Sequence, residues 1–166
     1  MKYKINKSIA GFSLVEILVY MSLMSIFLIV LLSIFIAALN TRLSSESTSV
    51  ISQDSRYILS KLSYDINNAD SIIYPDLGLS NTSLQLSASG SANTYSLSNG
   101  NLVKTVDGVS MNLNGIDTQI DSISFKNIGN IEGKSTIQIV YTVKSKIIVQ
   151  GGQTQSQTVN TTVGTR

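Results

Sequence analysis

The sequence predicts an α+β protein, in which one long N-terminal helix precedes a small antiparallel β-sheet. Three patterns lead to this prediction. Residues 17–39 form an uncharged and mostly apolar run. Between Ile51 and Ala69, apolar residues recur at spacings of three, four and seven, as on one face of an amphipathic helix. Beyond residue 78, apolar and polar residues alternate, which is typical of strands with one buried face.

The apolar run is long enough to cross a membrane as a helix. Its 23 residues would extend about 35 Å at 1.5 Å per residue, against about 30 Å for a hydrocarbon core. A secretory signal peptide has a shorter apolar region and a small-residue cleavage site, of which Ala37-Ala38 is a poor imitation. Lysines precede the run and only Arg42 follows closely, so we expect a cytoplasmic N-terminus and an extracytoplasmic C-terminal domain.

The helix is expected to continue beyond the membrane segment. No proline or glycine interrupts residues 12–74, so one helix from Phe12 to about Asn68 is the simplest prediction, with the Ser-rich residues 44–49 as its weakest part. The apolar face of the second half would pack on a globular domain. We expect the charged residues of this half to lie on its other faces; they are Asp54, Arg56, Lys61 and Asp65.

The rest of the chain is expected to form the sheet. Tyr74-Pro75-Asp76 and Gly78 end the helical pattern. Asn99-Gly100 and Asp107-Gly108 predict hairpin turns, because a type I′ turn needs two positive φ angles. The positions that mark the strands are Leu84, Leu86, Tyr95, Leu97, Leu102, Val103, Ile120, Ile123, Phe125, Ile137, Ile139, Tyr141, Val143, Val159, Thr161 and Val163.

Composition argues against an enzyme. The chain of 166 residues contains no cysteine and no histidine, and thus lacks the residues that most often serve as general bases, nucleophilic thiols and transition-metal ligands. The sequence also has no motif that would activate a serine nucleophile. No catalytic residue, cofactor or metal is expected.

Three weaker patterns do not amount to binding sites. Residues 129–135 are one residue short of a phosphate-binding loop and precede a strand. Asp107, Asp117 and Asp121 do not have the spacing of a calcium-binding EF-hand loop. Four lysines that might touch DNA lack interleaved aromatic residues, and solvated surface positions explain them better; they are Lys126, Lys134, Lys144 and Lys146.

One short block carries the strongest functional signal. Gly11-Phe12-Ser13-Leu14-Val15-Glu16 lies between a lysine-containing leader and the apolar run, and it places a lone carboxylate beside a membrane-length segment. Such a carboxylate is costly in lipid and usually has a function. The block resembles the N-terminal processing motif of type IV pilins and of the pseudopilins of type II secretion and competence systems.

The resemblance implies a pilin-like architecture and a set of site residues. A prepilin peptidase would cut after Gly11, and the new N-terminal Phe12 would be methylated. Residues 1–11 would thus be a removed leader, residues 12–42 a transmembrane and filament-core helix, and residues 43–166 an amphipathic helix with a β domain. Glu16 would form a salt bridge with the N-terminal amine of an adjacent subunit, so the expected partners are the peptidase, the membrane and other pilins.

The chain departs from major pilins in ways that favour a minor pilin or pseudopilin. Ser13 stands where the family often has threonine, and Ser33 stands where major pilins commonly have a proline.

Cleavage would also change the net charge of the chain. It would remove Lys2, Lys4 and Lys7, so the 12 basic and 10 acidic side chains become 9 (12 − 3) and 10. Net charge then gives little support for nucleic-acid binding, which is disfavoured but not excluded.

Two other interpretations of the sequence stay open. Glu16 could simply complement the helix dipole in the first turn, a contribution of about 0.3–1 kcal/mol. The chain could also be a single-span membrane anchor for an extracytoplasmic module that binds DNA or a secreted substrate. Processing at Gly11 distinguishes a filament subunit from a membrane anchor, because a plain anchor would keep its leader.

Overall fold

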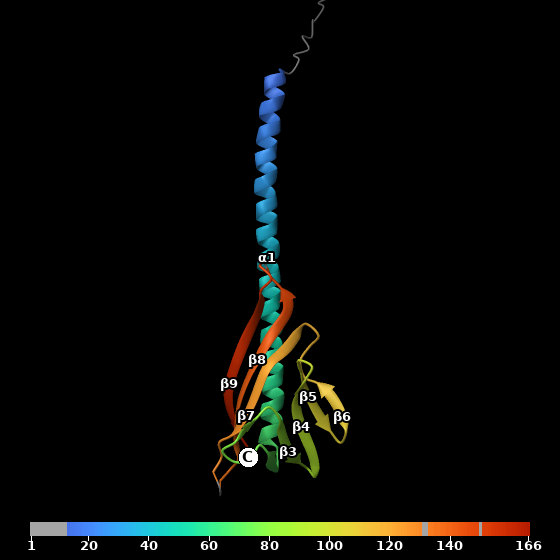
Figure 1. The fold of residues 1–166 in the computed structure, drawn as a ribbon, viewed down its shortest axis with the longest axis vertical. Coiled ribbons are helices and arrows are strands. Elements are labelled where there is room, and N and C mark those ends of the chain that lie inside the picture. The colour runs from blue at the N-terminus through green and yellow to red at the C-terminus, as the bar shows by residue number, and fades with distance from the viewer. Residues whose placement is uncertain (1–12, 131–132, 150) are drawn as a thin grey trace, which may run out of the picture. The chain divides into compact units, whose positions relative to one another are not determined.

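The computed structural model describes residues 13–130, 133–149 and 151–166. The chain divides into two compact units, Met1–Thr41 and Arg42–Arg166. The protein is α+β, with one long helix followed by antiparallel strands (Figure 1).

Helix α1 spans Leu14–Asn67 without a break, which confirms the prediction of one long helix. It begins just after Ser13, whose backbone carbonyl accepts hydrogen bonds from the amides of Glu16 (3.0 Å) and Ile17 (3.2 Å). The Ser-rich residues 44–49 stay helical. The hydroxyl of Thr48 donates to the carbonyl of Ser44 (2.9 Å), so its polar group is satisfied within the helix.

The strands of the second unit form two sheets. The five-stranded sheet has the order β1-β3-β4-β5-β6, and the four-stranded sheet has the order β2-β7-β8-β9. Their bounds are β1 Ser71–Tyr74, β2 Ser80–Asn81, β3 Leu84–Ala88, β4 Ser91–Ser98, β5 Asn101–Val106, β6 Val109–Asn112, β7 Thr118–Asn127, β8 Thr136–Ile148 and β9 Thr154–Gly164. All pairings are antiparallel.

The prediction of a single small sheet was therefore wrong. The short strand β2 leaves its sequence neighbours and pairs with β7, where Asn81 lies opposite Phe125. The loop before it is tied to the same strand, because the amide of Gly78 donates to the carbonyl of Asn127 (2.8 Å). Such long-range pairings depend on tertiary contacts, which local alternation does not reveal.

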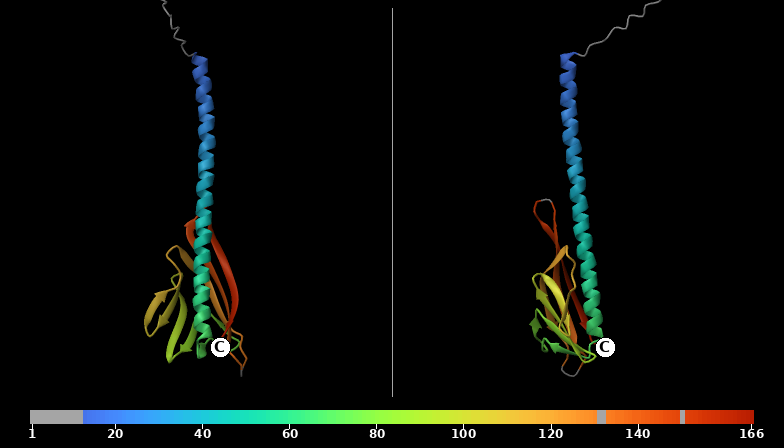
Figure 2. Two further views of the ribbon diagram at one scale, coloured as in Figure 1. Left: turned by 180° about the vertical axis from the view of Figure 1, so that it is seen from behind. Right: turned by 90° about the vertical axis from the view of Figure 1, so that its right-hand side faces the viewer.

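The strands lie alongside the second half of the helix (Figure 2), and both sheets share one hydrophobic core with it. Ile58, Leu62 and Ile66 of α1 are completely buried, as the helical periodicity predicted. Leu59, which shares that pattern, is only half-buried. Except for Val103 and Thr161, the strand positions named from the sequence belong to this core or pack against it. Those that are completely buried are Leu84, Leu86, Tyr95, Leu102, Phe125, Ile137, Ile139, Tyr141 and Val143.

The two predicted hairpin turns are confirmed. Asn99 and Gly100 have φ angles of 49° and 74° and connect β4 to β5, and Asp107 and Gly108 have φ angles of 49° and 82° and connect β5 to β6. A third turn of the same kind, which the sequence analysis missed, connects β3 to β4 through Ser89 (φ 52°) and Gly90.

Candidate functional site

The predicted site lies at the start of α1, and the structure describes part of it. Gly11 and Phe12 lie outside the described residues. Glu16 is described, and its side chain is exposed in the first turn of the helix. An acidic group there is favourably placed, since the first-turn amides have no partner within the helix and the helix dipole is positive at this end.

Glu16 has a hydrogen-bond partner that the sequence analysis missed. The hydroxyl of Tyr20 donates to Oε1 of Glu16 at 3.2 Å. Residues four positions apart face each other along a helix, so the spacing of the two residues could have revealed the pair. In a region without water, this hydrogen bond would lower the cost of a charged carboxylate.

The helix that carries Glu16 presents apolar side chains all round. From Leu14 to Leu39 every residue is exposed in the isolated chain. This stretch is long and apolar enough to cross a membrane by length and composition. An all-apolar helical surface of this kind needs lipid or other helices around it.

The few polar side chains of this stretch do not make it hydrophilic. The hydroxyls of Ser22, Ser25 and Ser33 donate to the carbonyls of Val19 (2.8 Å), Met21 (2.8 Å) and Ile29 (2.9 Å), respectively. Each hydroxyl hydrogen thus has an acceptor one turn back, as is common for serine in membrane helices. The surface stays apolar around all three.

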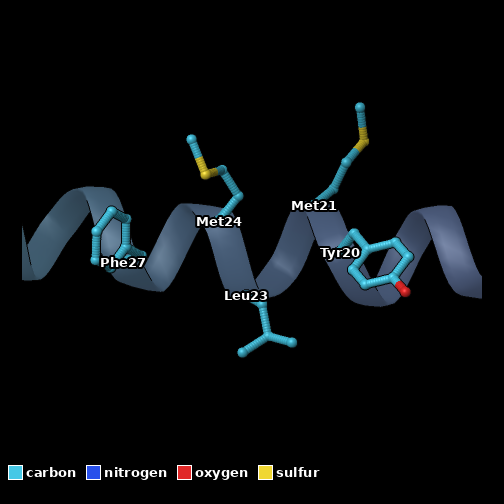
Figure 3. A pocket seen from close by; sticks show the side chains of 5 residues that line it. All are labelled: Tyr20, Met21, Leu23, Met24 and Phe27. Carbon is cyan, nitrogen blue, oxygen red and sulfur yellow. The ribbon is translucent and has the colours of Figure 1, made fainter.

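A shallow apolar groove marks the helix just after Glu16. It is lined by Tyr20, Met21, Leu23, Met24 and Phe27. Figure 3 shows the two methionines projecting to one side, Leu23 to the opposite side, and the rings of Tyr20 and Phe27 spaced along the helix. Only one helix contributes to this groove, so it encloses no ligand. Ridges and grooves spaced by three and four residues are the shape that receives a second helix.

One charged residue in the second half of α1 is buried, contrary to the prediction. The sequence predicted that Asp65 lies away from the apolar face, yet this residue is only 7% exposed, because β5 supplies a counterion within the core. The Lys104 ammonium lies 2.6 Å from Oδ2 of Asp65, and the Tyr95 hydroxyl donates to the same oxygen. Lys61, one turn before Asp65, adds a second cation at 3.5 Å. This group ties the helix to the five-stranded sheet.

The surroundings of Asp65 shift the pKa values within the group. Burial alone would raise the pKa of Asp65, but the hydrogen bonds from Lys104 and Tyr95 and the charges of Lys104 and Lys61 outweigh it and hold that pKa below its ordinary value. Burial and the hydrogen bond to Asp65 raise the pKa of Tyr95 well above its ordinary range. The carboxylate is thus ionised and fully partnered, as expected for a structural ion pair.

Two other predicted surface charges also hold loops in place. Asp54 of α1 accepts hydrogen bonds from the amide of Gly115 (2.8 Å) and from the hydroxyl of Thr118. Lys146, one of the four lysines that might touch DNA, donates to the carbonyl of Ile116 at 2.9 Å. Across the described residues, His, Cys, Asp and Glu side chains do not gather in groups of three or more that could hold a metal ion.

The first turn and the apolar surface of α1 therefore form the strongest candidate site, and this site is suited to contact with lipid or other helices.

Comparison of the chain with protein-family models, with curated proteins and with solved structures found no match.

Proposed function

We propose that this chain is a minor pilin or pseudopilin, a non-enzymatic structural subunit of a type IV pilus-like or type II secretion filament. It is inserted in the membrane with its N-terminus in the cytoplasm, cut after Gly11 by a prepilin peptidase and methylated on Phe12. It then enters a filament through its N-terminal helix. The resemblance of residues 11–16 to the processing motif of that family supports this proposal.

The observation that carries the proposal is the continuous apolar surface of α1 behind a single carboxylate. The helix exposes its large side chains on all sides from Leu14 to Leu39. A single-span anchor needs only lipid compatibility. A filament core, by contrast, needs helices that pack side by side, and rows of apolar side chains three and four residues apart, such as Tyr20, Leu23, Met24 and Phe27, suit such packing.

Glu16 has a defined role in this mechanism. After cleavage, the amine of Phe12 in one subunit approaches the Glu16 carboxylate of its neighbour. Each charge alone is costly in a low-dielectric setting, and the two together offset much of that cost. The pair therefore sets the axial register between subunits, and Tyr20 holds the carboxylate until the amine arrives.

The mature N-terminus tests the proposal. Intact-mass measurement and N-terminal sequencing of protein from the native host should give a chain that begins at Phe12 and carries one extra methyl group. A Gly11→Leu variant should keep its leader and accumulate in the membrane. A wild-type chain that starts at Met1 would instead support the single-span anchor with a binding module.

A further inference from the structure

Two of the sheet edges in the second unit have complementary chemistry. Strand β9 ends the four-stranded sheet and β6 ends the five-stranded sheet. The two strands lie on opposite sides of the domain and run in opposite directions (Figures 1 and 2). Two copies placed side by side in one orientation would therefore bring antiparallel edges together.

The β9 edge lacks charged residues and proline, which protect many sheet edges from pairing. It is 11 residues long. The amide of Thr165 donates to the carbonyl of Ser135 at 2.9 Å. Every second residue before Thr165 therefore bonds to β8, and the backbone groups of the residues in between point away from β8. The outward amides, which this alternation directs away from β8, are those of Ser156, Thr158, Asn160 and Thr162.

A cleft runs beside this edge on the face toward α1. It has a volume of about 260 Å³, and its lining includes Leu59 and Arg56 of the helix and Gln157 and Val159 of β9. Arg56 is exposed and takes part in none of the ion pairs among the described residues. A strand added to β9 would direct alternate side chains into this cleft. The edge thus offers backbone partners, an apolar contact and a positive charge.

Strand β6 has the features that this edge requires. All four of its residues are exposed, and Val109 and Met111 keep 69% and 51% of their surface. The amide of Leu113 donates to the carbonyl of Leu102 (2.8 Å), so the backbone groups of Ser110 and Asn112 point away from β5. Asp107 is the first residue of the turn into the strand and is exposed.

We propose that β6 of one copy pairs with β9 of a second copy and joins their sheets into one. Ser110 lies opposite Thr158 in this pairing, so Val109 meets Val159 and Met111 meets Gln157 over the cleft. Asp107 approaches Arg56 of the second copy. Because the two edges differ, the contact is head-to-tail and leaves an open edge at each end of an array. The contact involves only residues 42–166 and is independent of processing at Gly11.

Disulfide trapping of the full chain in membranes tests the contact, since the protein has no cysteine of its own. Ser110→Cys on one tagged copy and Thr158→Cys on another lie opposite each other in an antiparallel pair about 5.5 Å apart, within disulfide reach. Mild oxidation should give a mixed dimer. One chain with both substitutions should give a ladder of multimers. The matched control pairs Ser110→Cys with Ser122→Cys, which is exposed but lies on the inner strand β7.

Edge variants make the test specific to strand pairing. Ser156→Pro removes an outward amide and leaves the hydrogen bonds to β8 intact, so it should lower the mixed-dimer yield about five-fold, the effect of one lost backbone hydrogen bond. Ser156→Ala should have no effect. Arg56→Glu should also lower the yield, and Arg56→Lys should preserve it. A yield equal to the Ser122→Cys control, or equal yields for Ser156→Pro and Ser156→Ala, would overturn the proposal.

A negative result in this trapping experiment would leave the proposed function standing, because the mature N-terminus is measured separately. Conversely, a chain that keeps its leader could still give the mixed dimer. The two experiments therefore fail independently.

Discussion

Asp65 and Lys104 hold the second half of the helix to the five-stranded sheet through one buried charge pair. Both are 7% exposed, and the Tyr95 hydroxyl completes the coordination of the carboxylate. Removing one member of such a pair strands the other charge in the core. That cost usually exceeds the net stabilisation that the intact pair provides.

Lys104→Met should therefore destabilise the protein by about 3 kcal/mol at pH 7. The folded pKa of Asp65 lies below its unfolded value, so the stabilisation is fully present above pH 4 or so and is lost as the pH falls through the folded pKa. The difference in unfolding free energy between wild type and variant should thus shrink below about pH 4. Denaturant titrations at pH 7, 5 and 3 measure it.

Lys126→Met serves as the control for that experiment, because Lys126 is exposed on β7. Its unfolding free energy should stay within about 0.5 kcal/mol of wild type at each pH. A difference for Lys104→Met that does not change between pH 7 and pH 3 would contradict the role of the Asp65 charge.

Glu16 should matter for assembly and not for cleavage. Glu16→Gln keeps the size and the hydrogen-bonding capacity of the side chain but removes the charge that a neighbouring Phe12 amine needs. The processed variant should co-purify with the other pilins at least ten-fold less efficiently, since deep burial of the stranded amine costs about 3–5 kcal/mol. Co-purification from host membranes measures this.

Tyr20→Phe is the matched control for Glu16. It removes the 3.2 Å hydrogen bond to the carboxylate but keeps the charge. Assembly should fall by no more than a few-fold, in line with the loss of one exposed hydrogen bond. Normal assembly of Glu16→Gln would reduce the carboxylate to a helix-end residue.

Among the elements, the hairpins of the five-stranded sheet are set by two-residue turns with positive φ. Asn99-Gly100 and Asp107-Gly108 have the residues that type I′ turns favour. Ser89-Gly90 has serine at φ 52°, where asparagine or aspartate is preferred. The backbone conformation there is held partly by the amide of Ser89, which donates to Oδ2 of Asp70 (2.8 Å).

Ser89→Asn should therefore stabilise the protein by about 0.5 kcal/mol. The substitution keeps the backbone amide and its bond to Asp70, and asparagine adopts positive φ more readily than serine. Ser89→Val should destabilise it, because a β-branched residue is strained at that φ. Thermal unfolding of both variants beside wild type gives the signs, and a lower midpoint for Ser89→Asn would contradict the prediction.

At the scale of the whole molecule, the two units differ in whether their apolar side chains are exposed or buried. Residues 14–39 are exposed and apolar, whereas the second unit buries an aromatic and aliphatic core between the helix and two sheets. The second unit thus contains the contacts that a folded domain requires.

A chain of residues 45–166 should accordingly be soluble and fold by itself. The helical residues that cover the sheets, from Ser47 to Ile66, are all retained. We expect one cooperative unfolding transition, which circular dichroism in urea would record. A chain that starts at residue 60 would lose Ile51 and Ile58 from the core and should not fold. A gradual, non-cooperative transition of the longer chain would contradict the assignment of the core.

In the alkaline range, the same domain should lose stability as its buried tyrosines ionise on unfolding. Burial raises the pKa of Tyr141 to about 12, and its hydroxyl donates to the carbonyl of Ser55 at 2.7 Å. The folded pKa is raised, so the stabilisation is present below about pH 10 and is lost as the pH rises further. The loss of stability at high pH is a property of the core as a whole, because the pKa of buried Tyr95 is raised as well.

The sequence alone determined the elements that depend on local chemistry. Apolar periodicity predicted the buried face at Ile58, Leu62 and Ile66, and alternation predicted the strand from Ile137 to Val143. The Asn-Gly and Asp-Gly pairs predicted two turns, because their conformational preference resides in the residues themselves. The carboxylate of Glu16 stood out because it precedes a membrane-length apolar run.

Only the tertiary structure decided which strands pair and which charges are buried. The short β2 joins β7 across the domain, and a register shift between Ile120 and Ser122 explains why Ile120 and Ile123 of β7 both face the core. Asp65 has the same local signature as a surface carboxylate. Its burial depends on Lys104 and Tyr95, which are 39 and 30 residues away. Charge burial is decided by such distant partners, and sequence spacing does not encode where they will lie.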